Sequence, residues 1–196
     1  MKFHPLSLEG AYVIESEPRV DRRGSFTRLF CEHEFKEIGF ASRIVNVNFS
    51  FSLRKGTLRG LHFQKPPKAE NKIVRCMRGA VLDIIVDVRC RSKTFLKWEA
   101  VELTDANGQM LLVPEGFAHG FQTLCDNVEF LYFVTEFYSP QHEDGFRYDD
   151  PTLNIAWPLE PSEVSLRDRQ FPFIHTDYRG LDIPVPFDRV PFVSVT

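Results

Sequence analysis

Short apolar runs rich in β-branched and aromatic residues recur along the whole chain, and turn residues separate them. Runs of this length and composition are typical of β-strands. The predicted strands lie at residues 11–15, 57–63, 72–77, 80–88, 97–103, 109–113 and 128–137. Turns between them are expected at four glycines, namely Gly56, Gly79, Gly108 and Gly116. The pattern therefore predicts an all-β protein.

Helical signals are few. Residues 32–40 predict one or two helical turns that end near Gly39. Beyond about residue 159 prolines are frequent and the hydrophobic periodicity is weak. This tail is therefore expected to wrap around the β-structure as loops with short helical turns. We expect a single domain over residues 1–196, an all-β jelly-roll barrel that can hold one small ligand in its mouth.

Composition and charge narrow the possible partners. A chain of 196 residues, 43% hydrophobic and with 19 phenylalanines, is long enough to bury a sizeable core. The net charge of −3 and the scattered basic residues give no reason to expect a nucleic-acid partner. The amino terminus has no apolar segment of signal-peptide length, and the longest apolar runs are too short to span a bilayer. No membrane partner is expected either.

The four cysteines have no metal-site spacing. Cys31, Cys76, Cys90 and Cys125 include no C-x-x-C pair. Cys76 lies in an apolar strand-like run and is expected to be a buried thiol. A reducing, cytoplasmic setting fits this use of cysteine.

Two segments resemble the two-part signature of the cupin β-barrel. In residues 108–121 the second part is complete, with Gly108, five residues, Pro114, one residue, Gly116, two residues and His119. In residues 56–72 the first part keeps Gly56 and His62, but Gln64 stands where a second histidine is expected. In metal-binding cupins the histidines of this signature hold the metal. The resemblance with one ligand missing therefore implies a barrel that works without a metal or another cofactor.

A narrower resemblance, to the nucleotide-sugar 3,5-epimerases, covers most of the chain. Its motifs follow one another in the family's order at residues 21–26, 58–64, 72–79, 86–89, 114–121, 138–143, 149–158 and 165–168. The type enzyme of the family is dTDP-4-dehydrorhamnose 3,5-epimerase. The resemblance implies a cupin-type jelly roll that epimerises a nucleoside-diphosphate 4-keto-6-deoxyhexose. It also implies a homodimer in which N-terminal strands are exchanged.

Four residues match the family's catalytic set. The resemblance makes His62 the base that removes a proton beside the C4 ketone, and it makes Asp168 the partner that orients this base. Lys72 would stabilise the enolate oxygen, and Tyr132 would return a proton from the opposite side of the sugar. Taken singly, each residue type is more typical of a structural or solvated position, so these roles come from the resemblance.

Ten further positions match the family's substrate contacts, namely Arg23, Phe26, Arg28, Asn46, Asn48, Arg59, His119, Tyr138, Glu143 and Arg167. A nucleoside diphosphate needs cations and hydrogen-bond donors, and the guanidinium group suits phosphate. The resemblance assigns four basic residues to this task, namely Arg23, Arg59, His119 and Arg167. Tyr138 resembles the residue whose ring stacks on the nucleotide base.

Two of these positions depart from the family pattern. Arg28 stands where the family has an acidic residue, and Asn46 stands where it has glutamine. Arginine offers only donors in place of an acceptor. We therefore expect a relaxed or altered base preference, with cytidine and guanosine diphosphate sugars as candidates beside thymidine.

Strand alternation makes two geometric predictions. One face of the run at 128–137 and its continuation is expected to carry Phe130, Tyr132, Val134, Glu136 and Tyr138. Strict alternation would put Arg59 and His62 on opposite faces of their strand. A bulge at Gly60 is therefore expected to bring both side chains inward.

The sequence leaves three alternative functions open. A mono-epimerase that inverts only C3 or only C5 would need the same acid and base, so the motifs do not separate it. A metal-dependent cupin oxygenase or isomerase would use His62, His119 and one other ligand, and Gln64 argues against such a site. A non-catalytic sugar-binding cupin would not require an acid opposite a base.

Overall fold

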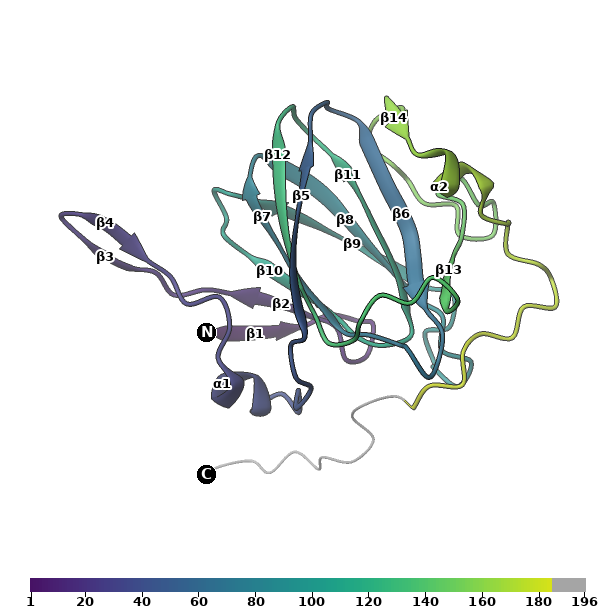
Figure 1. The fold of residues 1–196 in the computed structure, drawn as a ribbon, viewed down its shortest axis with the longest axis horizontal. Helices are drawn as coiled ribbons and strands as arrows, with labels where there is room; N and C mark the ends of the chain where they lie inside the picture. Colours follow the sequence, from purple (N-terminus) through teal and green to yellow (C-terminus); the bar gives the residue numbers. More distant parts are fainter. Residues whose placement is uncertain (185–196) are drawn as a thin grey trace.

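The computed structural model describes residues 1–184, and its body consists of two antiparallel sheets that face each other (Figure 1). The first sheet has the order β1 (Lys2–Pro5), β2 (Tyr12–Glu15), β10 (Met110–Val113), β7 (Lys72–Arg78), β12 (Val128–Val134) and β5 (Asn46–Ser52). The second has the order β13 (Glu143–Gly145), β6 (Thr57–Gln64), β11 (Phe117–Thr123), β8 (Ala80–Asp87) and β9 (Trp98–Thr104). This architecture confirms the predicted all-β jelly-roll barrel.

Smaller elements lie at the edges of the barrel. β3 (Arg19–Asp21) and β4 (Gly24–Phe26) form a hairpin that projects away from the body (Figure 1). The short helix α1 (Glu32–Lys36) follows this hairpin. β14 (Glu163–Val164) pairs in parallel with β6 and leads into the second short helix, α2 (Leu166–Gln170). No helix within residues 1–184 is long and apolar enough to cross a membrane.

All seven predicted apolar runs form strands, and the predicted helix is present as α1. The turn after α1 ends at Gly39, whose positive φ of 76° is easily reached only by glycine. Half of the fourteen described strands were not predicted, namely β1, β3, β4, β5, β11, β13 and β14. The two longest of these are β5 and β11. β5 carries asparagine and serine at alternate positions, and β11 is interrupted by Gly120 and polar side chains. Both strands lie at the cavity described below, where polar residues replace the apolar ones that usually mark a strand.

The main core lies between the two sheets. Its members include Val74, Cys76, Leu111 and Phe130 from the first sheet and Val81, Ile85, Leu103 and Phe121 from the second. The rings of Phe121 and Phe130 stack across the core with their centroids 4.7 Å apart. Burial raises the pKa of the Cys76 thiol to about 11, which agrees with the buried thiol predicted for this position.

The C-terminal segment covers the outer face of the second sheet. A second apolar cluster there joins Leu61, Phe63 and Ile84 of the sheet to Phe146 and Leu153 of the segment that follows β13. The tail predicted to wrap the barrel is confirmed as far as residue 184, with α2 as its helical turn. This wrap is what brings α2 to the edge of the barrel mouth.

Candidate active site

A cavity of about 600 Å³ lies in the barrel mouth, and it takes side chains from both sheets and from α2. All four predicted catalytic residues line it, namely His62, Lys72, Tyr132 and Asp168. Six of the predicted binding residues line it too, namely Asn46, Asn48, Arg59, Tyr138, Glu143 and Arg167. The sequence therefore predicted ten of the residues that line the cavity.

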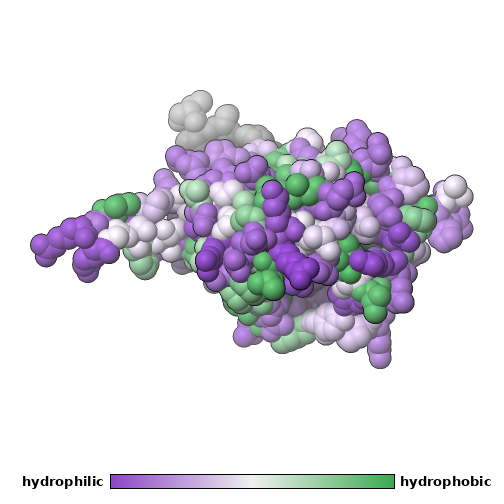
Figure 2. Space-filling model, turned by 90° about the horizontal axis from the view of Figure 1, so that it is seen from above, coloured by the Kyte–Doolittle hydropathy of each residue, from purple (hydrophilic) through white to green (hydrophobic). Residues whose placement is uncertain are grey.

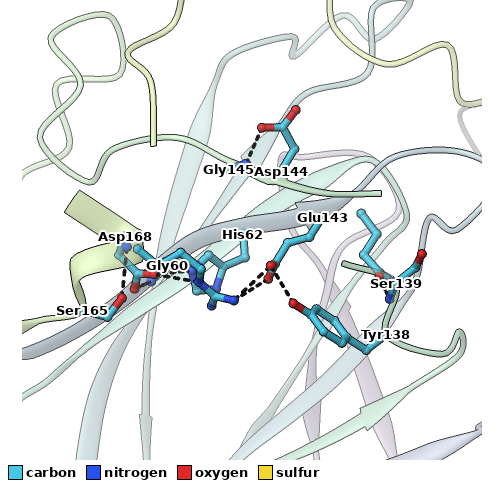
Figure 3. Close-up of polar contacts among 11 residues, drawn as sticks. Gly60, His62, Tyr138, Ser139, Glu143, Asp144, Gly145, Ser165 and Asp168 are labelled. Atoms are coloured by element: carbon cyan, nitrogen blue, oxygen red, sulfur yellow. Dashed lines mark hydrogen bonds and ion pairs between the residues drawn. The ribbon is translucent and has the colours of Figure 1, made fainter. Parts of the chain in front are cut away.

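His62 and Asp168 form a hydrogen-bonded pair across the cavity edge (Figure 3). His62 Nε2 lies 2.9 Å from Asp168 Oδ1, and the backbone N–H of Gly60 donates to Oδ2 at 3.0 Å. Burial disfavours the charged form of Asp168, but the hydrogen bonds and the charge of His62 outweigh it and lower the pKa of Asp168 to about 2. An ionised carboxylate only accepts hydrogen bonds, so Nε2 carries the proton and Nδ1 is left as the ring's proton acceptor.

The local sequence fixes this aspartate. Ser165 caps α2, and its Oγ accepts the backbone N–H of Asp168 at 3.0 Å. The cap sets the start of the helix and turns the Asp168 side chain towards β6, where it is almost fully buried. A residue 106 positions away from His62 is thereby placed as its partner.

Tyr132 stands in β12 and lines the same cavity. Its hydroxyl lies 3.0 Å from Ser50 Oγ on the neighbouring strand β5. Burial raises the pKa of Tyr132 to about 12. The phenol is thus protonated at neutral pH and available as a proton donor. The predicted shared face of this run is confirmed for Tyr132, Val134, Glu136 and Tyr138, which all line the cavity, although the strand itself ends at Val134.

Lys72 is the first residue of β7, and its ammonium lies 3.3 Å from Glu70 Oε1. Both side chains line the cavity and are only 14% and 13% exposed. Glu70 was not predicted from the sequence, where a glutamate in a loop carries no signal of its own. The lysine is therefore not a solvated strand-end residue, because it faces the cavity with a carboxylate partner.

The predicted bulge at Gly60 is confirmed. β6 takes three steps from Arg59 to His62, while the partner strand β11 takes two from Phe121 to His119. The extra residue puts Arg59 and His62 on the same side of the sheet, and both line the cavity. Arg59 then donates to Ser52 Oγ and to the carbonyl oxygen of Phe51.

The outer rim of the cavity holds a polar cluster (Figure 3). Arg167 Nη1 donates to both carboxylate oxygens of Glu143 at 3.0 Å, and the Tyr138 hydroxyl donates to Glu143 Oε2 at 2.9 Å. The Tyr138 ring is 59% exposed. An exposed ring at the rim of a cavity is a suitable platform for a nucleotide base.

His119 has a different partner from the predicted phosphate. Its Nε2 lies 2.9 and 3.0 Å from the two oxygens of Asp83, and both side chains are buried behind the cavity wall. His119 on β11 stands opposite His62 on β6 in the register of the two strands. It is not among the residues that line the cavity. Burial raises the pKa of Asp83, while His119 and Lys72 act in the opposite direction. Like Glu70, Asp83 lies close to the site and was not predicted from the sequence.

Three predicted binding residues lie away from the cavity within one chain. Arg23 and Phe26 belong to the projecting β3–β4 hairpin, where Arg23 pairs with Asp21 at 2.6 Å. Arg28 follows the hairpin and faces Glu34 at 3.9 Å. Figure 2, seen from above, shows the hairpin as an arm beyond the body of the molecule. These three residues therefore do not line the cavity of their own chain, and their role as substrate contacts stays a prediction.

The positions of the cupin signature hold no converging metal ligands in the described part of the chain. Within residues 1–184 no three His, Cys, Asp or Glu side chains form a group that could hold a metal ion. His62 and His119 each bond to their own carboxylate. Gln64 lines the cavity, but it is largely buried and its side-chain amide bonds to the backbone of Lys68 and Ser139.

A jelly-roll barrel whose mouth joins a histidine–aspartate pair, a protonated tyrosine and a lysine defines an acid–base enzyme of the cupin type. Comparison with known proteins narrows this class. The sequence profile of dTDP-4-dehydrorhamnose 3,5-epimerase matches residues 5–176, and the chain belongs to this family. It is accordingly an isomerase of the carbohydrate-epimerase type.

The relatives cover nearly the whole chain. The dTDP-4-dehydrorhamnose 3,5-epimerase of Methanothermobacter thermautotrophicus is 43% identical over 87% of this chain and 92% of its own length. A crystal structure of the Bacillus anthracis enzyme with TDP and PPi bound has a TM-score of 0.86 at 39% identity, over 88% of this chain and 99% of that chain. A 3'-monoepimerase from Streptomyces bikiniensis in complex with dTDP-quinovose has a TM-score of 0.81 at 35% identity, over 87% and 86%.

The first prediction concerns Asp168→Asn, which replaces the carboxylate by a neutral group of the same shape. The pKa of Asp168 is lowered on folding, so its charge stabilises the folded state above about pH 4, and this contribution is lost as the pH falls through about 2. We expect the free energy of unfolding of the variant to be about 2 kcal/mol lower at pH 7. The difference from the unmodified protein should narrow below about pH 4. Denaturant unfolding between pH 7 and pH 3 measures it, and a difference independent of pH would contradict the assignment.

Proposed function

We propose that this protein is a metal-independent epimerase that inverts C3, C5 or both in a nucleoside-diphosphate 4-keto-6-deoxyhexose. The observation that carries the proposal is the convergence of His62, Lys72 and Tyr132 on one cavity, with Asp168 bonded to the histidine. The family membership and the TDP and dTDP-quinovose bound in solved relatives support the same substrate class.

The reaction follows from the C4 ketone, which acidifies the hydrogens on the neighbouring carbons. His62 takes such a proton at the nitrogen not bonded to Asp168, and the aspartate stabilises the imidazolium that forms. The electron pair of the broken C–H bond moves into the enolate, whose oxygen is stabilised by the Lys72 ammonium. Tyr132 then gives its proton to the carbon from the other side and inverts the centre. A positioned acid or base typically contributes about 10²–10⁴-fold each.

The nucleotide fits the outer half of the cavity. Arg59 and Arg167 supply guanidinium groups for the diphosphate, and Tyr138 supplies a ring for the base. Asn46 and Asn48 on β5 also line the cavity, and their side-chain amides offer both hydrogen-bond donors and acceptors. A cytoplasmic location belongs to the same proposal, since the four cysteines are free thiols, as is usual in reducing compartments.

The protein is proposed to act as a homodimer in which the β3–β4 hairpin reaches the partner's cavity. The hairpin projects from its own body and exposes Val20 and Phe26 by 75% and 69%. The edge strand β5 likewise exposes Val47 and Phe51 by 57% and 47%. Apolar side chains gathered in this way are typical of an interface. Arg23, Phe26 and Arg28 would then serve the partner's site, as the family resemblance implies.

The comparisons include both 3,5-epimerases and a 3'-monoepimerase at similar identity and TM-score. A mono-epimerase is therefore the second candidate. Both reactions use the same acid and base, so the carbons that exchange hydrogen with the solvent distinguish them.

The second prediction tests the acid and the base. Incubated with a 4-keto-6-deoxyglucose nucleotide in deuterated water, the protein should incorporate deuterium at the inverted carbons, with or without a chelator. His62→Ala should abolish incorporation while free nucleotide still binds. Tyr132→Phe removes one hydroxyl and should reduce net inversion much more than proton abstraction. Bound stoichiometric metal with loss of turnover on chelation would favour the oxygenase or isomerase instead.

The third prediction concerns the shared cavity. His62→Ala and Arg23→Ala should each be inactive or nearly so as homodimers. When the two are mixed and allowed to exchange subunits, half of the dimers combine one of each, and each mixed dimer has one intact cavity. Activity should therefore return to roughly a quarter of the unmodified level. No recovery in dimers shown to have exchanged would mean that Arg23 does not act on the partner's cavity.

The fourth prediction concerns the base. Asn46 lines the cavity, and Arg28 would approach it from the partner. We expect kcat/KM for thymidine, cytidine and guanosine diphosphate forms of one 4-keto sugar to lie closer together than in an Arg28→Glu, Asn46→Gln double variant. A thymidine preference of several hundred-fold in the unmodified protein, about 3–4 kcal/mol, would show that the two departures do not alter recognition.

A further inference from the structure

The cavity holds a carboxylate that none of the proposed roles uses. Glu70 lies two residues before Lys72, and its Oε1 is 3.3 Å from the Lys72 ammonium. Both side chains line the cavity, and both are more than four-fifths buried. A pair shielded from water in this way interacts more strongly than an ion pair on the surface.

The backbone on both sides of Glu70 is held in place. The side chain of Asn71 donates to Glu115 and accepts the backbone N–H of that residue, while the backbone N–H of Asn71 donates to Thr135 Oγ1 at 2.8 Å. On the other side, Gln64 donates to the carbonyl oxygen of Lys68 at 2.9 Å. The loop therefore presents the carboxylate from a fixed point.

A lysine ammonium needs such support to stabilise an enolate. It is a point charge on a flexible stem of four carbons, with three rotatable donors. Stabilisation of a developing charge is effective only when the donor is already in place, since its reorganisation would otherwise cost free energy during the reaction. Asp83 also interacts electrostatically with Lys72, but its hydrogen bonds go to His119. Glu70 is thus the acid that directly contacts the ammonium.

We propose that Glu70 is a positioning residue for Lys72, an inference that rests on the proposed epimerase function. The ion pair at 3.3 Å holds the ammonium in the cavity, where its N–H donors can reach the C4 oxygen of the substrate. Because the contact matters most when negative charge develops on that oxygen, its loss should lower kcat and leave KM nearly unchanged.

The test compares Glu70→Ala, Glu70→Gln, Lys72→Ala and the double variant Glu70→Ala, Lys72→Ala by deuterium incorporation and steady-state kinetics. Glu70→Ala should lower kcat at least about 10-fold with KM within about 3-fold, a loss typical of a misplaced catalytic group. Glu70→Gln keeps an acceptor oxygen and should recover part of the loss. Adding Glu70→Ala to Lys72→Ala should cause no further loss, since Glu70 acts through the lysine.

Glu32→Ala is the matched control, because Glu32 and Lys36 form an exposed ion pair at 2.6 Å on the outer side of α1. It should react at the unmodified rate. An unchanged kcat in Glu70→Ala, or losses that multiply in the double variant, would overturn the positioning role while leaving the epimerase function intact. Absence of exchange in the unmodified protein would instead overturn the proposed function, and the role of Glu70 with it. Thermal unfolding of each variant separates these effects from loss of the fold.

Discussion

The buried carboxylate of Asp168 joins the C-terminal wrap to the barrel, and the geometry of the site depends on this contact. Its two oxygens accept hydrogen bonds from the His62 ring and from the backbone of Gly60 on β6. The same contact fixes the ring's tautomer and holds α2 at the mouth, so it also places Arg167 beside Glu143. The C-terminal segment therefore does more than cover the second sheet, because it also supplies one wall of the cavity.

The close approach of β6 and β11 is a second constraint, and it explains the glycines at that point. A Cβ atom on Gly60 would lie 2.6 Å from the Gly120 Cα, and one on Gly120 would lie 2.6 Å from the Arg59 carbonyl oxygen. Both distances are shorter than van der Waals contact allows, so neither position accepts a side chain. The bulge that turns Arg59 and His62 to the same side thus requires glycine on both strands.

The sequence was informative where one residue pattern has one physical meaning. Apolar runs such as those at 72–77 and 80–88 predicted their strands, and Gly60 between two inward residues predicted the bulge. Family motifs supplied the pairing of His62 with Asp168, which separation along the chain does not reveal. Glu70 and Asp83 were missed because a carboxylate in a loop or an apolar strand gives no sign of which cation it will meet. The projecting hairpin is consistent with the exchange of N-terminal strands that the resemblance implies, although a motif by itself identifies a contact and not the chain that makes it.

Most cationic side chains that line the cavity form an ion pair with a carboxylate. This pairing affects where a diphosphate can bind. His62 bonds to Asp168, Lys72 to Glu70 and Arg167 to Glu143. Arg59 differs, because its hydrogen bonds go to a serine hydroxyl and a backbone carbonyl oxygen, both neutral. Its positive charge is thus the least compensated in the cavity wall, and a phosphate can bind it without displacing a carboxylate. Arg167 must share its guanidinium with Glu143 or release it. Initial attraction of the nucleotide to Arg59, followed by rearrangement at the rim around Arg167, is the order that these charges favour.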